Sequence, residues 1–166
     1  RDRSPSRGLG DVYKRQDYVR SIGSLAGKAD IILPNVTEAA ILSGLPYQEN
    51  IDKNYVNQLL NGLNHPCAVL TGVDFDEDST GIVLQEGTVQ HEYRHKRIGT
   101  GCHGTGDIFA AVFTGALMQG KNRLDAAKIA ADFTCRCIKN TVNAPAHWYG
   151  VKFEPLLPEL MEMLGR

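Results

Sequence analysis

Apolar and polar positions recur along the chain with two different periods, which predicts both strands and helices. Short apolar runs bounded by glycine or proline are typical of strands, and apolar residues three to four positions apart are typical of amphipathic helices. The runs predict strands at 29–33, 67–71, 81–85 and 88–94. The helical spacing predicts helices at 17–27, 39–43, 52–64, 106–119, 123–141 and 154–164. Strands that alternate with helices indicate an α/β layered sheet.

The predicted strands differ in how deeply we expect them to be buried. Residues 29–33 and 67–71 are apolar throughout, which is typical of strands buried on both faces. Residues 81–85 and 88–94 have polar edges and meet at Glu86-Gly87, which indicates a hairpin. The helix predicted at 106–119 is apolar on nearly all sides, so we expect it to be buried against several neighbours.

The first sixteen residues form a separate segment, RDRSPSRGLGDVYKRQ, without apolar periodicity. We interpret residues 1–16 as a disordered arm. The string also resembles a translated sequencing-adaptor tail, which would make it a non-native scar that fold reasoning should exclude. The alternative is a natural basic arm.

Charge and composition exclude several classes of protein. The 166 residues include 18 basic and 19 acidic ones, a formal net charge of −1, so the chain has no field that favours nucleic acid or an anionic membrane. No apolar run approaches the roughly 18 residues of a membrane-spanning helix. Four scattered cysteines without a C-x-x-C pair fit a reducing compartment. Cys135 and Cys137 lie two apart in a helical pattern and so face opposite ways, which argues against zinc. We therefore expect a cytoplasmic protein that binds neither nucleic acid nor membranes.

The most informative stretch is a glycine-rich turn that leads directly into the helix predicted at 106–119. Backbone amides at such a turn form a candidate anion site. The chain has no G-x-x-x-x-G-K-[ST] pattern, which excludes P-loop chemistry. Gly99, Gly101 and Gly104 match G-x-G-x-x-G, but the strand before them is charged, which argues against a dinucleotide site.

Three polar residues have two interpretations each. Asp107 is either an acid favoured by the dipole at the start of a helix or a general base beside the anion site. Asn35 and Glu38 are spaced as a capping box at the start of the next predicted helix. Alternatively, they lie at the carboxyl end of a strand, where they could hold hydrated Mg²⁺ beside phosphates.

Several motifs occur in an order and spacing that resemble the ribokinase-like superfamily, and within it the bacterial pyridoxamine/pyridoxal (vitamin B6) kinases. The resemblance covers residues 17–166. It rests on Gly104-Thr105-Gly106-Asp107, Pro34-Asn35-Val36-Thr37-Glu38, Leu70-Thr71-Gly72-Val73, Asp132-Phe133-Thr134 and the segment from His147 to Glu154.

The resemblance implies the C-terminal portion of a three-layer α/β/α sandwich. It also implies transfer of the ATP γ-phosphoryl group to the 5′-hydroxymethyl group of a B6 vitamer, with Asp107 as the base. The anion hole would be Gly104, Thr105 and Gly106. Asn35 and Glu38 would serve the metal, directly or through water, and ATP would be bound by Thr71, Gly72 and Asn35. The implied cofactors are ATP and Mg²⁺, with a monovalent cation as a further candidate, and the full-length form is expected to be a homodimer.

Kinases of this kind have a substantial N-terminal half, which carries much of the substrate pocket. We therefore expect residues 17–166 to be the C-terminal, ATP-side part of the domain, without turnover on its own. A hydroxymethylpyrimidine or sugar kinase of the same superfamily is the alternative among enzymes, and a non-catalytic nucleotide-binding fragment is the alternative outside them. We expect Trp148, the only tryptophan, to pack rather than to act in catalysis.

Overall fold

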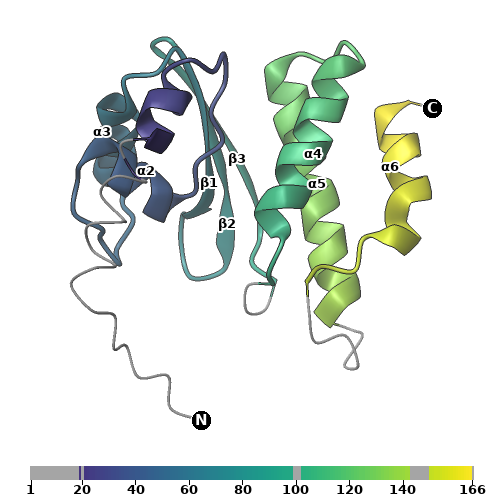
Figure 1. Cartoon of the computed structure of the whole chain (residues 1–166). Coiled ribbons are helices and arrows are strands. Elements are labelled where there is room, and N and C mark those ends of the chain that lie inside the picture. The colour runs from purple at the N-terminus through teal and green to yellow at the C-terminus, as the bar shows by residue number, and fades with distance from the viewer. Residues whose placement is uncertain (1–18, 20, 99–101, 143–149, 166) are drawn as a thin grey trace.

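The computed structural model describes residues 19, 21–98, 102–142 and 150–165. A three-stranded sheet lies between two layers of helices, and α6 lies outside the second layer (Figure 1). Residues 21–26 are helical and precede the first labelled element. The elements that follow are α2 (Val36–Ser43), α3 (Lys53–Leu63), β1 (Cys67–Asp74), β2 (Ser79–Glu86), β3 (Val89–Lys96), α4 (Thr105–Met118), α5 (Arg123–Val142), η1 (Glu154–Leu156) and α6 (Leu157–Leu164).

The sheet has the order β1-β2-β3, and both pairs of strands are antiparallel. Glu86 and Val89 are partners across a two-residue turn, and Gly87 in that turn has a φ of 57°. A positive φ at the first turn residue suits a tight hairpin, and glycine adopts it without steric cost. The hairpin predicted at Glu86-Gly87 is confirmed, with both strands extending beyond the predicted limits.

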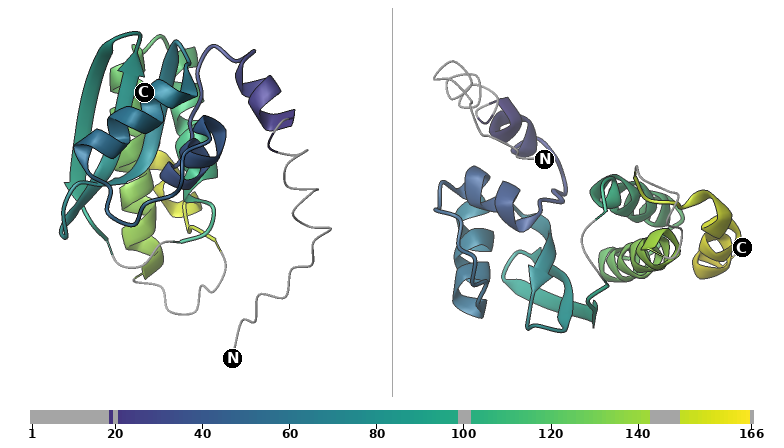
Figure 2. Two further views of the ribbon diagram at one scale, coloured as in Figure 1. Left: turned by 90° about the vertical axis from the view of Figure 1, so that its left-hand side faces the viewer. Right: turned by 90° about the horizontal axis from the view of Figure 1, so that it is seen from below.

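Alternate residues of β1 and β2 face two different hydrophobic cores. Cys67, Val69, Ile82 and Leu84 pack with α4 and α5, whereas Ala68, Leu70 and Val83 pack with α2 and α3. The view along the sheet shows these helix layers on opposite sides of the strands (Figure 2). Because side chains of a strand alternate between faces, a continuous apolar run such as 67–70 is what a strand covered on both sides requires. The structure thus confirms an α/β fold with helices on both faces of the sheet.

The prediction of a regular strand at 29–33 is wrong. This segment makes only isolated parallel bridges to β1, at Ile32 with Ala68 and at Asn35 with Thr71. Ile31, Ile32 and Leu33 are half-buried rather than buried on both faces. Within the described residues the segment has a strand neighbour on one side only, and Pro34 has no N–H to donate, so the ladder remains short.

The helix at 106–119 is also less enclosed than its composition predicts. Phe109, Val112, Phe113 and Ala116 of α4 are buried, but Met118 is 83% exposed. The helix therefore covers the sheet with one face instead of being surrounded. Among the described residues, none of the helices combines the length and the apolar character needed to cross a membrane.

Two polar side chains fix α5 and the early segment to the sheet. The hydroxyl of Tyr93 in β3 donates to Asp132 of α5 at 2.7 Å, and burial together with this bond raises the pKa of Tyr93 to about 12. The ring nitrogens of His65 lie 2.7 Å from the Cys67 carbonyl oxygen and 2.9 Å from the Ala29 carbonyl oxygen. These contacts position α5 on one side of the sheet and the Ala29 segment beside β1.

Candidate active site

The end of β1 contains a bulge that brings polar residues to one face of the sheet. The register with β2 shifts between Thr71 and Val73, and the intervening Gly72 has a φ of 66°. An extra residue in a strand reverses the alternation of faces beyond it. Thr71 and Asp74, three positions apart, therefore share the face toward α4, and both line the same cavity.

Parallel pairing with β1 places Asn35 beside this bulge. The amide of Thr71 donates to the Pro34 carbonyl at 2.9 Å, and Asn35 and Thr71 form a bridge. The side chain of Asn35 accepts a hydrogen bond from the Glu38 amide at 2.8 Å, and Glu38 accepts one from the Asn35 amide at 3.0 Å. The capping box is therefore present at the start of α2. Both side chains are also exposed and line the cavity, so capping does not remove them from it.

The N-terminus of α4 faces the same space. Gly104 is its N-cap residue, with a φ of 84°, and no side chain caps the helix. The first intrahelical bond in this turn runs from the Ile108 amide to the Gly104 carbonyl at 3.1 Å. The amides of the first turn have no acceptor within a helix, and the helix dipole adds partial positive charge there. This end of α4 can bind an anion.

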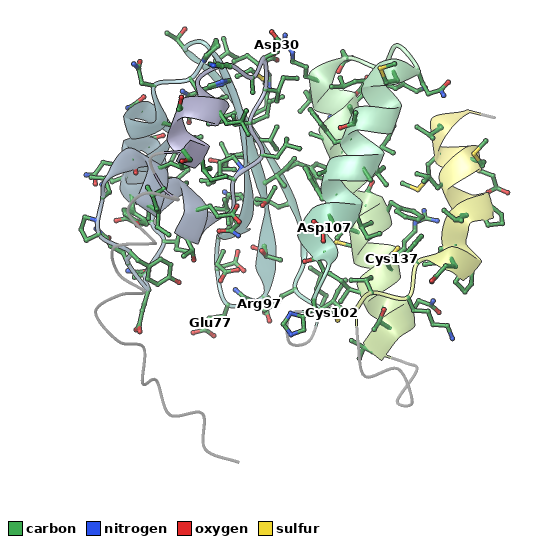
Figure 3. The ribbon with its side chains drawn as sticks, in the orientation of Figure 1. Asp30, Glu77, Arg97, Cys102, Asp107 and Cys137 are labelled. Carbon is green, nitrogen blue, oxygen red and sulfur yellow. The ribbon has the colours of Figure 1, made fainter. Side chains whose placement is uncertain are left out.

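Asp107 is the third residue of α4 and is exposed. Figure 3 shows Asp107 near the start of α4, at the same end of the molecule as Arg97 and opposite to Asp30. A carboxylate in this position adjoins the anion-binding amides and can accept a proton from a hydroxyl group that approaches them.

A cavity of about 550 Å³ brings these elements together. Seven of the eight residues predicted for the site line it directly: Asn35, Glu38, Thr71, Gly72, Thr105, Gly106 and Asp107. Gly104 is not part of its wall and instead sets the turn that starts α4. Asn35 and Asp107 are 72 positions apart in the sequence, so the convergence of these residues is a property of the fold.

The wall toward α5 is more apolar and includes one unusual contact. The thiol of Cys135 lies 3.1 Å from Nδ1 of His95, and both residues line the cavity. Burial, with the nearby charge of Asp132, raises the pKa of Cys135 to about 11. Cys135 is therefore a protonated thiol that can donate to His95. Cys137, two residues on, belongs to the hydrophobic core instead, so the two thiols face different ways.

Sequence reasoning missed five polar residues of the cavity: Asp74, Thr80, His95, Arg97 and Cys135. Period-two alternation could have found three of them, because Thr80 shares a strand face with Ile82, and His95 and Arg97 share one with Tyr93. Asp74 required knowledge of the bulge, which only Gly72 indicated. Gly99, Gly101 and Trp148 lie outside the described residues.

The described residues contain no group of three or more His, Cys, Asp or Glu side chains that could hold a metal ion. The few oxygen donors of the cavity nevertheless fit Mg²⁺. That ion keeps most of its waters and uses one or two carboxylates together with substrate phosphates. Glu38 and Asn35 line the cavity with side-chain oxygen atoms, and a phosphate bound at the start of α4 would complete such a set.

The fold is of the ribokinase-like type, which the chain shares with solved structures of a pyridoxal kinase and of a protein assigned as a phosphomethylpyrimidine kinase. Residues 9–151 match the profile of the family described as phosphomethylpyrimidine kinase. The chain belongs to this family. The match begins at residue 9, within the segment 1–16.

Individual relatives carry two kinds of name. The hydroxymethylpyrimidine/phosphomethylpyrimidine kinase of Haemophilus influenzae is 26% identical over 144 residues, 83% of this chain and 53% of the relative. Pyridoxal kinase from Lactobacillus plantarum is 31% identical with a TM-score of 0.76, covering 89% of this chain and 55% of that structure. The chain spans about half the length of the curated relatives it matches.

Two further solved structures contain ligands. A Bacteroides thetaiotaomicron protein assigned as a phosphomethylpyrimidine kinase was crystallised with pyridoxal; it is 27% identical, with a TM-score of 0.73, over 89% of this chain and 53% of that one. Pyridoxal kinase from Staphylococcus aureus, in complex with ADP, is 25% identical with a TM-score of 0.66, over 74% of this chain and 47% of that one.

The backbone of Gly104 provides a test of how the anion-binding end of α4 is built. A methyl group added at Gly104 or at Gly106 would meet no atom within 4 Å, but only Gly104 has a positive φ. We expect Gly104→Ala to lower the free energy of unfolding by about 1 to 2 kcal/mol, because an L-residue is strained there. Gly106→Ala is the matched control and should be neutral or stabilising by up to about 1 kcal/mol. Urea denaturation of both variants measures the difference, and equal stabilities would contradict this role of Gly104.

Proposed function

We propose that this chain forms the ATP-side part of a kinase that phosphorylates the 5′-hydroxymethyl group of a vitamin B6 compound. The observation that carries the proposal is the convergence of Asp107, the uncapped start of α4, and Asn35 with Glu38 around one cavity. Phosphoryl transfer needs an anion cradle, a metal contact and a base next to one another, because positioning and charge stabilisation do most of the work. The ADP complex of the related Staphylococcus kinase supports nucleotide as the ligand.

In the proposed reaction, Asp107 accepts the proton of the acceptor hydroxyl group. The hydroxyl oxygen then forms a bond to the γ-phosphorus, the bond from that phosphorus to the β–γ bridging oxygen breaks, and ADP leaves with the electron pair. The amides of Thr105 and Gly106 face the transferred group and stabilise its charge. Thr71 and Gly72 lie beside the remaining phosphates. Mg²⁺, held through Glu38 and Asn35 directly or by water, neutralises phosphate charge when bound.

The acceptor has two candidates of the same class. A B6 vitamer is supported by the 31% identity to a pyridoxal kinase and by the relative crystallised with pyridoxal. Hydroxymethylpyrimidine is supported by the matching family and by the names of the curated relatives. Both are aromatic nitrogen heterocycles with a primary hydroxymethyl group, so Asp107 and the start of α4 serve either one.

A direct assay separates the two acceptors. The protein expressed from its complete reading frame is given MgATP with pyridoxal, pyridoxamine, pyridoxine or hydroxymethylpyrimidine at equal concentrations, and ADP release is coupled to NADH oxidation. We expect kcat/KM to be at least tenfold higher for one of the B6 vitamers. A preference of the same size for hydroxymethylpyrimidine would replace the B6 assignment and keep the kinase. If none of the four acceptors gave ADP release, the proposed function would be contradicted.

Asp107→Asn tests the base. In the same full-frame protein we expect kcat to fall about 100-fold or more, with little change in nucleotide affinity, because general-base catalysis contributes factors of this size. Asp125→Asn is the matched control, since Asp125 also lies in the first turn of a helix, α5, but does not line the cavity. Near wild-type turnover of Asp107→Asn would mean that Asp107 is not the base and only interacts favourably with the dipole of α4.

Glu38→Gln tests the metal contact separately from the capping box. Glutamine can replace glutamate in a capping box, so the free energy of unfolding should change by less than about 0.5 kcal/mol. Loss of the carboxylate should raise the Mg²⁺ concentration needed for half-maximal ADP binding by about fivefold or more. An unchanged magnesium titration, measured by calorimetry, would leave Glu38 with the capping role alone.

A further inference from the structure

The cavity has an uneven balance of charge. Three carboxylates line it, those of Glu38, Asp74 and Asp107. Among the described lining residues, Arg97 is the only arginine or lysine. A nucleotide polyphosphate that enters this space brings further negative charge, so Arg97 is the side chain of the described wall best suited to offset it.

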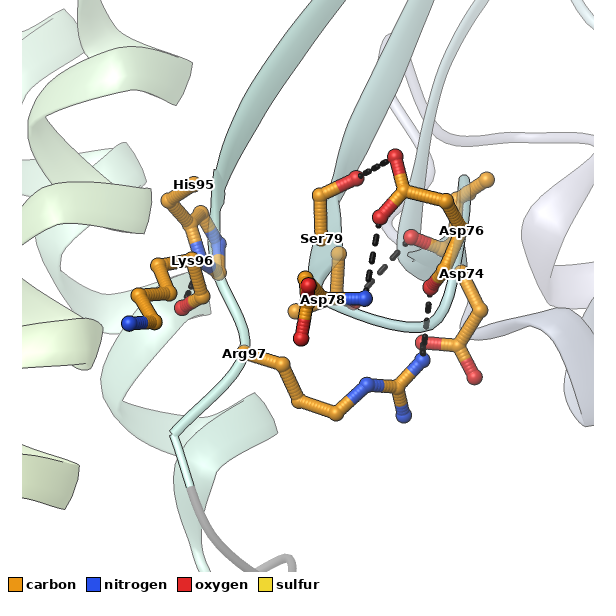
Figure 4. Close-up of polar contacts among 9 residues, drawn as sticks. Asp74, Asp76, Asp78, Ser79, His95, Lys96 and Arg97 are labelled. Atoms are coloured by element: carbon orange, nitrogen blue, oxygen red, sulfur yellow. Dashed lines mark hydrogen bonds and ion pairs between the residues drawn. The ribbon is translucent and has the colours of Figure 1, made fainter.

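Arg97 is held at the mouth of the cavity by the turn between β1 and β2. Nη2 of its guanidinium lies 2.9 Å from Oδ1 of Asp74 and 3.4 Å from the Asp76 carbonyl oxygen, and its backbone N–H donates to the Asp78 carbonyl at 2.7 Å (Figure 4). The turn itself is closed by Asp76, whose carboxylate accepts from Ser79 and from the Asp78 amide. The backbone of Arg97 is thus fixed while its side chain is not enclosed.

The ion pair between Arg97 and Asp74 is exposed. The side chain of Arg97 is 40% exposed and that of Asp74 is 44% exposed. Exposed pairs of this kind contribute little to stability because water screens them and two side chains lose freedom. A phosphate, with more charge and a geometry that accepts two N–H bonds from one guanidinium, can therefore compete for Arg97.

The strand alternation explains why this arginine faces the cavity. His95 pairs with Thr80, and Arg97 continues the face of Tyr93 and His95. Arg94 lies on the opposite face, where its guanidinium is 4.1 Å from the centre of the Phe75 ring and 2.7 Å from Glu92.

We propose that Arg97 contacts the β- and γ-phosphates of the bound nucleotide, and that Asp74 holds the guanidinium at the mouth of the cavity until the nucleotide arrives. This inference rests on the proposed function, since it takes the ligand of the cavity to be ATP. It makes Arg97 a phosphate-binding residue and Asp74 a positioning residue. Removal of Asp74 should then favour binding, because it releases Arg97 and removes one repelling charge.

Calorimetric titration with AMP, ADP and ATP in the presence of Mg²⁺, at one ionic strength, tests this on the 166-residue chain. For Arg97→Gln we expect Kd to rise about tenfold for ADP and ATP and less than twofold for AMP, which lacks the β- and γ-phosphates. Arg97→Lys should recover part of the loss. Arg94→Gln, from the opposite face of β3, is the matched control and should bind all three like the wild type. Asp74→Asn should bind ADP about threefold more tightly.

The outcomes distinguish this inference from the proposed function. A wild-type chain that binds none of the three nucleotides overturns both. The inference alone is overturned if the wild-type chain binds ADP and Arg97→Gln loses affinity for AMP, ADP and ATP by the same factor. A merely structural role of Arg97 would weaken the binding of every ligand alike. Weaker ADP binding by Asp74→Asn overturns the role of Asp74, and circular dichroism of each variant establishes that it is folded.

Discussion

The site depends on the double pairing of β1 at its carboxyl end. Thr71 bonds to Pro34 on one side and pairs with Ile82 of β2 on the other, so the start of α2 and the hairpin are both fixed relative to this residue. The bulge at Gly72 then turns Asp74 to the face of Thr71. Gly81 lies opposite the bulge, where a methyl group would overlap the Tyr93 carbonyl, so the strands approach closely at the cavity. Without this arrangement, Asn35, Thr71 and Asp74 would not face α4 together.

The proposed chemistry depends on the backbone amides at the start of α4, which form the wall of the cavity opposite β1. The start of α4 has no side-chain cap, because the N-cap residue is a glycine, and its amides remain available to a ligand. The first turn nevertheless carries the carboxylate of Asp107, which a simple anion site would not favour. An uncapped helix start combined with an acid suits a reaction in which an anion is held while a nearby proton is removed.

Much of the fold could be predicted because β1, the hairpin and the helices have strong local patterns. The buried run of 67–70 and the glycine at 87 determine their elements locally. The segment 29–33 could not be predicted as it is, since regular pairing depends on neighbours on both sides rather than on its apolar residues. Asn35, Glu38, Thr71, Thr105, Gly106 and Asp107 were found because they belong to recognisable motifs. Arg97, His95 and Cys135 reach the cavity through strand register and helix packing, which no short motif encodes.

The central claim is that nucleotide binds where α4 begins and where β1 ends. The most direct measurement is a titration of the ¹⁵N-labelled chain with MgADP, followed by amide chemical shifts. We predict that the largest changes occur at Thr105, Gly106 and Asp107, with smaller ones at Asn35, Thr71 and Gly72, and that the amides of α6 do not shift. Saturable shifts confined to α6 or to the outer edge of β3, with the start of α4 unaffected, would contradict the claim.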